Sequence, residues 1–119
     1  MGLLSPTPVS VAETDRIVQA RLGWILAASE PEAVILFGSA ASGKLTEASD
    51  LDFALIYRDA GSKKAGRVAV HSRRPPDSWP VDLLFYTREE FARHCKTGGV
   101  CELILTEGKI LHGSIGSIL

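Results

Sequence analysis

Short apolar segments alternate with amphipathic ones along this chain, and this alternation is the feature that most narrows its fold. Runs rich in Val, Ile, Leu, Phe and Tyr predict strands at 33–37, 51–57, 81–86 and 109–111. Helical periodicity and capping signals predict helices at 10–29, 62–73, 88–95 and 100–105. The pattern predicts an α/β (α+β) fold in which a small mixed sheet is flanked by helices.

Composition sets the size and class of the molecule. The 119 residues, 45% hydrophobic and 23% charged, fit a single domain spanning 1–119, with 1–9 and 113–119 as flexible tails. A formal net charge of −1 supplies no overall attraction to nucleic acid or an anionic membrane. No apolar run reaches the roughly 20 residues of a membrane span. We therefore expect a soluble domain with neither a membrane nor a nucleic acid as direct partner.

The expected compartment predicts the redox state of the two cysteines. The first residues have neither a basic region nor a long apolar region, so they do not resemble a signal peptide. A reducing cytoplasm is then the expected location, and Cys95 and Cys101 are predicted to be free thiols with a buried or neutral role. A zinc site is disfavoured because four ligands in paired spacing are missing.

Three aspartates carry the chemical argument. Asp50 and Asp52 are two residues apart at the start of a predicted strand, so both carboxylates point to one face. Asp82 begins the next predicted strand and lies opposite the face of Val81 and Leu83. If the two strands pair, the three carboxylates meet at one end of the sheet, where their repulsion favours a bound cation such as Mg²⁺. Taken singly, each aspartate is better explained as a turn cap or a surface residue.

A glycine turn follows the first predicted strand. Gly38 allows a phosphate to approach the backbone closely, and Ser39 can donate both its hydroxyl and its backbone N–H. Ten residues separate Ser39 from Asp50, enough for the chain to turn back into the next strand. A P-loop is disfavoured, because that motif needs Ser or Thr directly after Lys44, where this chain has a leucine.

A Gly-Ser after an apolar strand, followed ten residues later by Asp-x-Asp and then by a third acidic strand, resembles the nucleotidyltransferase superfamily that includes DNA polymerase beta. The chain is most similar to its minimal members, over about residues 10–112. The resemblance implies that Asp50, Asp52 and Asp82 are catalytic and bind two Mg²⁺ ions, with Mn²⁺ as an alternative. It also implies that Gly38 and Ser39 bind phosphate. Minimal members often carry Arg where this chain has Ser42, and Lys44 is the candidate replacement.

The resemblance also implies a function. We expect transfer of a nucleoside monophosphate, AMP first among them, from NTP to an acceptor hydroxyl, with Asp82 activating that hydroxyl. Minimal members pair with a helical partner protein encoded nearby and act as the antitoxin of a toxin–antitoxin pair, so a similar partner is expected here. One alternative is a non-catalytic antitoxin module that binds its partner. A small-molecule (antibiotic) nucleotidyltransferase is less favoured on size, and a homodimer stays open.

Two further features have both a functional and a structural interpretation. Basic residues fall near helical spacing in the 62–74 segment: Lys63, Lys64, Arg67, His71 and Arg74. They could bind triphosphate, nucleic acid or an acidic partner, although a solvated helix face is the simpler interpretation. Trp24 and Trp79 are predicted to be core or interface residues.

Overall fold

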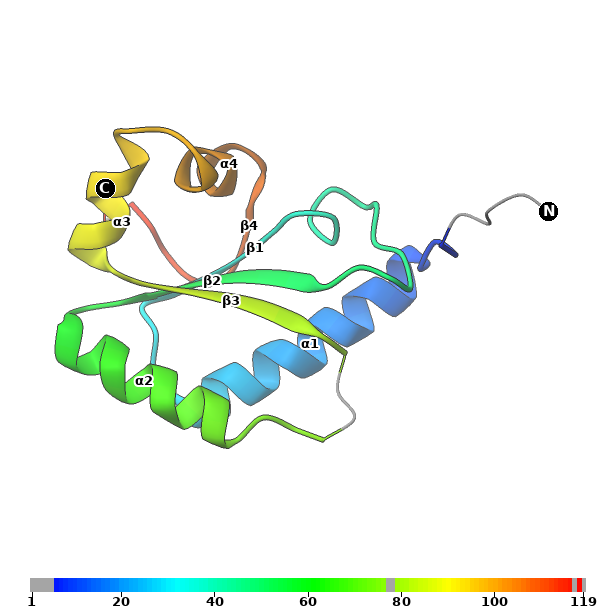
Figure 1. Cartoon of the computed structure of the whole chain (residues 1–119), viewed down its shortest axis with the longest axis horizontal. Coiled ribbons are helices and arrows are strands. Elements are labelled where there is room, and N and C mark those ends of the chain that lie inside the picture. Colours follow the sequence, from blue (N-terminus) through cyan, green and yellow to red (C-terminus); the bar gives the residue numbers. More distant parts are fainter. Residues whose placement is uncertain (1–5, 77–78, 117, 119) are drawn as a thin grey trace.

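The computed structural model describes residues 6–76, 79–116 and 118. Within these residues the elements follow one another as α1 (Val11–Ala28), β1 (Ala33–Phe37), β2 (Leu51–Tyr57), α2 (Ala60–Ser72), β3 (Val81–Thr87), α3 (Arg88–Cys95), α4 (Val100–Glu107) and β4 (Lys109–Gly113) (Figure 1). Each predicted helix and strand is present, and the α+β class is confirmed. No helix among the described residues is both long enough and apolar enough to cross a membrane.

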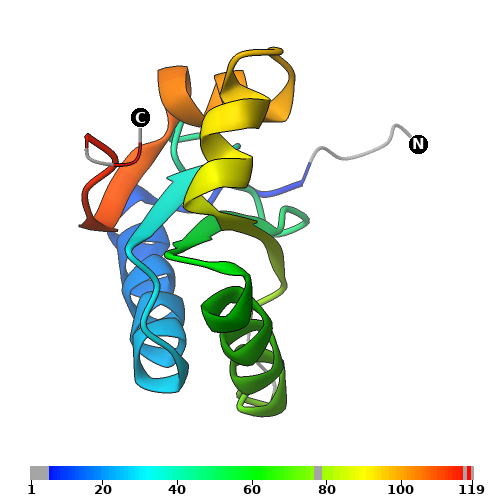
Figure 2. The ribbon, with the colours of Figure 1, turned by 90° about the vertical axis from the view of Figure 1, so that its left-hand side faces the viewer.

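The four strands form one mixed sheet in the order β3-β2-β1-β4. β1 is antiparallel to both β2 and β4, whereas β2 and β3 run parallel. Helices α1 and α2 cover one face of the sheet, and α3 and α4 cover the other (Figures 1 and 2). β2 is central and buried along almost its whole length, while β3 is only half-buried.

Strand alternation divides the core between the two layers. Leu51, Phe53 and Leu55 of β2 point toward α1 and α2. Ala54 and Ile56 point the other way, into the cluster that includes residues of α3 and α4. The even-numbered positions of β2 therefore belong to the α3/α4 face, which decides where Asp52 points.

Capping groups set where the helices begin. The Ser10 hydroxyl accepts the backbone N–H of Glu13 at 3.1 Å and starts α1, and Thr87 with Glu90 forms the predicted capping box of α3. α2 begins at Ala60, earlier than predicted, because an Asp59 carboxylate oxygen accepts the N–H of Ser62 at 2.8 Å.

The described parts of the two predicted tails make specific contacts. The N–H of Val9 donates to the Leu45 carbonyl at 2.9 Å, and the N–H of Glu47 donates to the Thr7 carbonyl at 2.9 Å. Near the other end, Ile118 is buried in the α3/α4 cluster. The remainder of both tails, residues 1–5, 117 and 119, lies outside the described residues.

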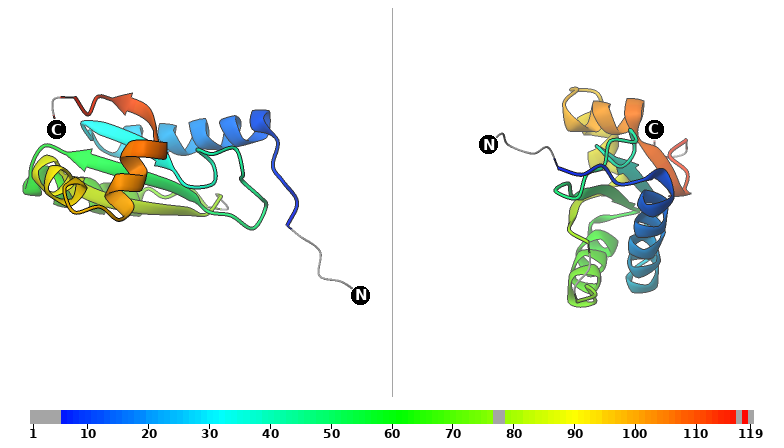
Figure 3. Two further views of the ribbon diagram at one scale, coloured as in Figure 1. Left: turned by 90° about the horizontal axis from the view of Figure 1, so that it is seen from above. Right: turned by 90° about the vertical axis from the view of Figure 1, so that its right-hand side faces the viewer.

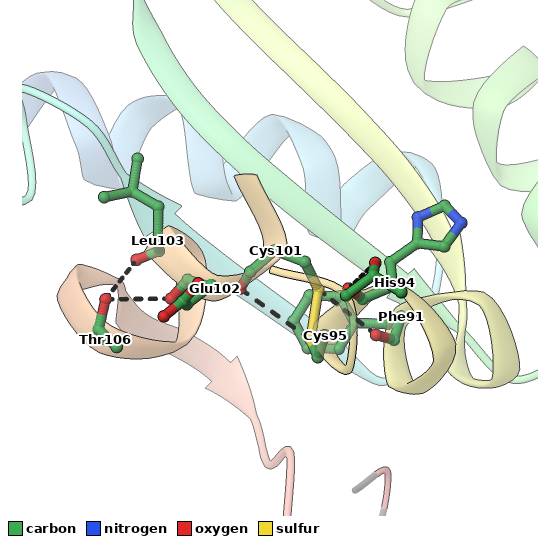
Figure 4. The surroundings of a disulfide bond; sticks show 8 residues. Phe91, His94, Cys95, Cys101, Glu102, Leu103 and Thr106 are labelled. Atoms are coloured by element: carbon green, nitrogen blue, oxygen red, sulfur yellow. Dashed lines mark hydrogen bonds between the residues drawn. A yellow bond between two sulfur atoms is a disulfide. The ribbon is translucent and has the colours of Figure 1, made fainter. Parts of the chain in front are cut away.

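The prediction of free thiols is wrong, because a disulfide joins Cys95 at the end of α3 to Cys101 in the first turn of α4 (Figure 4). Gly98 and Gly99 lie between them with φ of 82° and 75°, values that only glycine adopts readily. The turn they make brings the two cysteine Cα atoms to 5.0 Å. Cys101 is buried as expected, with its Sγ 3.4 Å from the Phe91 carbonyl oxygen.

Reduction should lower the stability of the oxidised protein. A cross-link over such a short loop removes denatured-state entropy worth about 2 kcal/mol. We expect dithiothreitol to lower the melting temperature of the wild-type protein by several degrees. Cys95→Ser should have the same melting temperature as the reduced wild-type protein, and dithiothreitol should not change it. An equal effect of reductant on Cys95→Ser would show that the bond contributes nothing.

Candidate metal and phosphate site

The parallel pairing of β2 and β3 places two of the predicted site residues side by side. In its register Asp52 is the direct partner of Asp82. Both side chains project to the α3/α4 face of the sheet, because they alternate with residues that point toward α1 and α2. Asp50 lies just before β2, two residues from Asp52. Asp50 and Asp82 are exposed and Asp52 is half-buried.

Two hydrogen bonds hold the start of β2 against the start of β3. The N–H of Leu51 donates to the Pro80 carbonyl at 3.0 Å, and the Trp79 indole N–H donates to the Ser49 carbonyl at 2.9 Å. They bracket Asp50 and so position the backbone that carries it. Trp79 was predicted to be a core or interface residue, and its positioning role was not predicted from the sequence. The signal was an indole donor two residues before the strand that carries Asp82.

Gly38 lies against the Asp52 carboxylate. Phe37 pairs with Asp52 across β1 and β2, so the residue that follows turns directly over the acid. A Cβ atom at position 38 would overlap Oδ2 of Asp52 and lie 3.1 Å from its Cγ. Gly38 also has φ of 73°. Space and backbone conformation therefore both require glycine here, and the predicted glycine turn meets the predicted acidic pair.

The turn from Gly38 to Lys44 closes on its own backbone. The N–H of Ser42 donates to the Gly38 carbonyl at 3.2 Å, and the N–H of Lys44 donates to the Ser39 carbonyl at 2.8 Å. The Lys44 side chain is exposed, and Ser39 is half-buried. The chain then runs through an irregular segment into β2, whereas a P-loop would enter a helix here.

Two neighbouring carboxylates act electrostatically on Asp52. Burial raises the pKa of Asp52 above its ordinary value, and the charges of Asp82 and then Asp50 raise it further. Asp82 and Asp50 therefore both lie within electrostatic reach of the Asp52 carboxylate, which is the centre of the acidic group. A cation at that centre would relieve the repulsion, as the sequence predicted.

The chemistry of these groups fits a magnesium ion. Ionised carboxylates are hard oxygen donors, which Mg²⁺ prefers, and Gly38 leaves the Asp52 oxygens free of side-chain cover. In residues 6–76, 79–116 and 118, no three Asp, Glu, His or Cys side chains are gathered closely enough to hold a metal. Bringing Asp50, Asp52 and Asp82 onto one ion therefore requires rotation of their side chains, and the metal site stays a prediction.

A cavity of about 360 Å³ lies at the opposite end of the sheet from the acids. Its lining includes Tyr57, whose hydroxyl is hydrogen-bonded to that of Ser29 at 2.8 Å, and Gly66, which packs on the Tyr57 ring. None of the three aspartates lines it. The acidic end of the sheet is therefore separate from this cavity.

Comparison with known proteins agrees with this geometry. The family model described as polymerase beta, nucleotidyltransferase, matches residues 24–114, which include both the glycine turn and the three aspartates. The chain belongs to this family. No curated protein matches the sequence significantly.

Solved structures similar to this nucleotidyltransferase domain are distant in sequence. A candidate nucleotidyltransferase from Sulfolobus solfataricus has 16% identity and a TM-score of 0.54, with 92% of this chain and 89% of that one covered. A chain from the crystal structure of a toxin–antitoxin with AMP-PNP has 22% identity and a TM-score of 0.48, covering 84% of this chain and 77% of that one. At its low identity, the Sulfolobus likeness supports the fold alone.

Substitution at Gly38 should be far more damaging than at a matched glycine in the same turn. Gly38→Ala combines the strain of a positive φ with a clash against Asp52, and we expect a loss of about 2–3 kcal/mol in unfolding free energy. Gly43 has φ of 77° but nothing within 4 Å of an added Cβ. Gly43→Ala should therefore cost only about 1 kcal/mol in urea unfolding. Equal losses would mean that Asp52 does not constrain Gly38.

Removing one charge from the acidic pair should stabilise the metal-free fold. The raised pKa of Asp52 means that its ionised form destabilises the native state, so stability falls as pH rises from about 4 through the native pKa of Asp52. In EDTA at pH 7, Asp82→Asn should raise the unfolding free energy by roughly 0.5 kcal/mol. The gain should shrink at acid pH, because the raised pKa of Asp52 leaves that carboxyl neutral there. Destabilisation at pH 7 would instead give Asp82 a structural role.

Proposed function

We propose that this chain is a metal-dependent nucleotidyltransferase that moves a nucleoside monophosphate, AMP first among the candidates, from NTP to an acceptor hydroxyl on a partner protein. The observation that carries the proposal is the pairing of Asp52 with Asp82 directly against Gly38. Family membership supports the same kind of chemistry.

Each part of the site has a distinct task in this proposal. Backbone and hydroxyl groups of Gly38 and Ser39 bind the β and γ phosphates, with the exposed Lys44 able to add a positive charge. Mg²⁺ held by Asp50, Asp52 and Asp82 would neutralise phosphate charge and polarise the reacting oxygens. Hydrogen bonds from Trp79 and Leu51 keep the acids in place, so the chain contributes chiefly by positioning.

The reaction is a single displacement at the α phosphorus. The acceptor oxygen forms a bond to that phosphorus while the bond to the oxygen bridging to the β phosphate breaks, and pyrophosphate leaves. The proton of the acceptor hydroxyl passes to the carboxylate of Asp82. Asp82 is suited to this task because it is the exposed member of the Asp52–Asp82 pair and can be reached from solvent.

A protein acceptor suits the open form of the site. Asp50 and Asp82 are both exposed, so a hydroxyl carried on a large molecule can reach them. The similarity to minimal nucleotidyltransferases suggests a helical partner encoded nearby, which this chain would modify as an antitoxin.

Transfer should depend on the acids and on a divalent metal. We expect Mg²⁺ with ATP to raise the melting temperature, because ligands that bind only the native state stabilise it. With α-labelled ATP, Mg²⁺ and the product of the neighbouring gene, label should move to that protein. Asp52→Asn should reduce the transfer by roughly two orders of magnitude.

The control for this experiment is Glu107→Gln, which removes an exposed acid of α4 that the proposal does not use. It should transfer label at the wild-type rate. Tight binding of the neighbouring protein without label transfer would contradict the enzymatic proposal and identify a non-catalytic binding module. A melting temperature unchanged by millimolar Mg²⁺ and ATP would count against the nucleotide site itself.

A further inference from the structure

One side of α2 carries a line of exposed basic residues. Lys64, Arg67, His71 and Arg74 follow one another at intervals of three and four residues, so they share one side of the helix and its C-terminal extension, and all four are exposed. We call these four residues the basic strip. It is about 15 Å long at the helical rise per residue. Lys63 is not part of it, because its ammonium pairs with Glu90 of α3 at 2.8 Å.

The basic strip runs along β3. The Arg67 guanidinium lies 5.9 Å from the centre of the Phe85 ring, and the His71 ring lies 5.6 Å from it. At the other end, Arg74 donates to the Val81 carbonyl at 3.3 Å. The strip therefore extends from the middle of β3 back to its first residue. Its Arg74 end reaches the backbone next to Asp82, whose side chain points to the other face of the sheet.

β3 is an outer strand of the sheet. The strand order places β2 on one side of it, and no described strand lies on the other. The views from the front and from above show β3 at the front margin of the sheet, with α2 beneath it on the same side of the molecule (Figures 1 and 3). An outer strand offers backbone N–H and C=O groups to which an extended segment can pair.

Residues 60–74 are basic, unlike the chain as a whole. Residues 60–74 include five Lys and Arg residues and no Asp or Glu, although the chain has a net charge of −1. Such segregation attracts an acidic partner to this side of the molecule alone. The net charge of −1 disfavours nucleic acid, because domains that bind it generally have an overall excess of Lys and Arg over Asp and Glu.

We infer that the basic strip and the outer edge of β3 together form the docking site for an extended acidic segment of the partner protein. The segment adds as a strand beside the middle of β3, between the Val81 carbonyl that Arg74 occupies and the Thr87 N–H that Glu90 occupies. Its carboxylates contact Lys64, Arg67 and His71. It leads to Asp82, where the acceptor hydroxyl is needed. The inference rests on the proposed function for the role of acceptor, but the docking itself needs neither metal nor nucleotide.

A labelled peptide tests the docking directly. The probe is a fluorescent dodecapeptide of alternating Glu and Thr, and its binding is followed by anisotropy in EDTA without nucleotide. Wild-type protein should bind it, and added salt should weaken the complex. Arg67→Glu with His71→Glu should weaken binding roughly tenfold or more. The matched control is Arg93→Glu with Lys96→Glu at the C-terminal end of α3, two exposed positions whose reversal should leave binding unchanged.

Further arms separate the components of the inference. If the double charge reversal does not fold, the milder variant Arg67→Gln with His71→Gln replaces it. This variant is also expected to weaken binding. A peptide of the same charge with alternate backbone amides methylated should bind poorly, since it cannot pair with β3. Equal binding of that peptide would overturn strand addition. No binding of the unmodified peptide, or binding untouched by the strip variants, would overturn the site.

Two outcomes distinguish this inference from a nucleic-acid surface and from the enzymatic proposal. Tighter, strip-dependent binding of an oligothymidylate of equal length would identify a nucleic-acid surface and overturn the proposed occupant. Asp52→Asn, which should strongly reduce transfer, should still bind the peptide. Absence of transfer by the wild-type protein, with docking intact, would count against the enzymatic proposal alone. Transfer to the partner protein without docking would count against this inference alone.

Discussion

The parallel pairing of β2 with β3 is the constraint on which the site depends. Its register sets Asp52 opposite Asp82, and the antiparallel partner on the other side of β2 sets Phe37, and hence Gly38, beside the same carboxylate. A shift of either register by one residue would move an acid to the opposite face of the sheet and into the core. Central burial of β2 between two helical layers makes such a shift expensive, so the core of the fold also fixes the geometry of the acids.

The acidic end of the sheet is unfavourable for the isolated chain. Burial and two neighbouring charges raise the pKa of Asp52, which means that its ionised form opposes folding. Gly38 adds a positive φ that costs conformational entropy. Groups that reduce stability and yet lie together beside one turn are typical of a functional site. The helical layers packed on the two faces of the sheet offset the stability that this arrangement loses.

The molecule separates its tasks in space. Acids gather at the end of the sheet where β2 and β3 begin, basic residues line the outer side of α2, and the disulfide joins α3 to α4 on the opposite face (Figures 1 and 4). Arg74 is the link between the first two regions, since it belongs to the basic strip and donates to the residue before Asp82. A segment docked along the strip would therefore reach the backbone that carries Asp82, while the carboxylate of Asp82 lies on the other face of the sheet.

Periodicity and capping by themselves determined the order of helices and strands, since strand alternation and caps such as Thr87 with Glu90 are local properties. The same local patterns placed the aspartates on one face and the glycine beside a strand end. Only the tertiary structure decided the strand order, the Asp52–Asp82 register, the hydrogen bond from Trp79, and the disulfide of Cys95 with Cys101. Each of these features joins two segments that are apart in the sequence. The distance between such segments in the folded protein depends on how the helices pack on the sheet, which local sequence patterns do not determine.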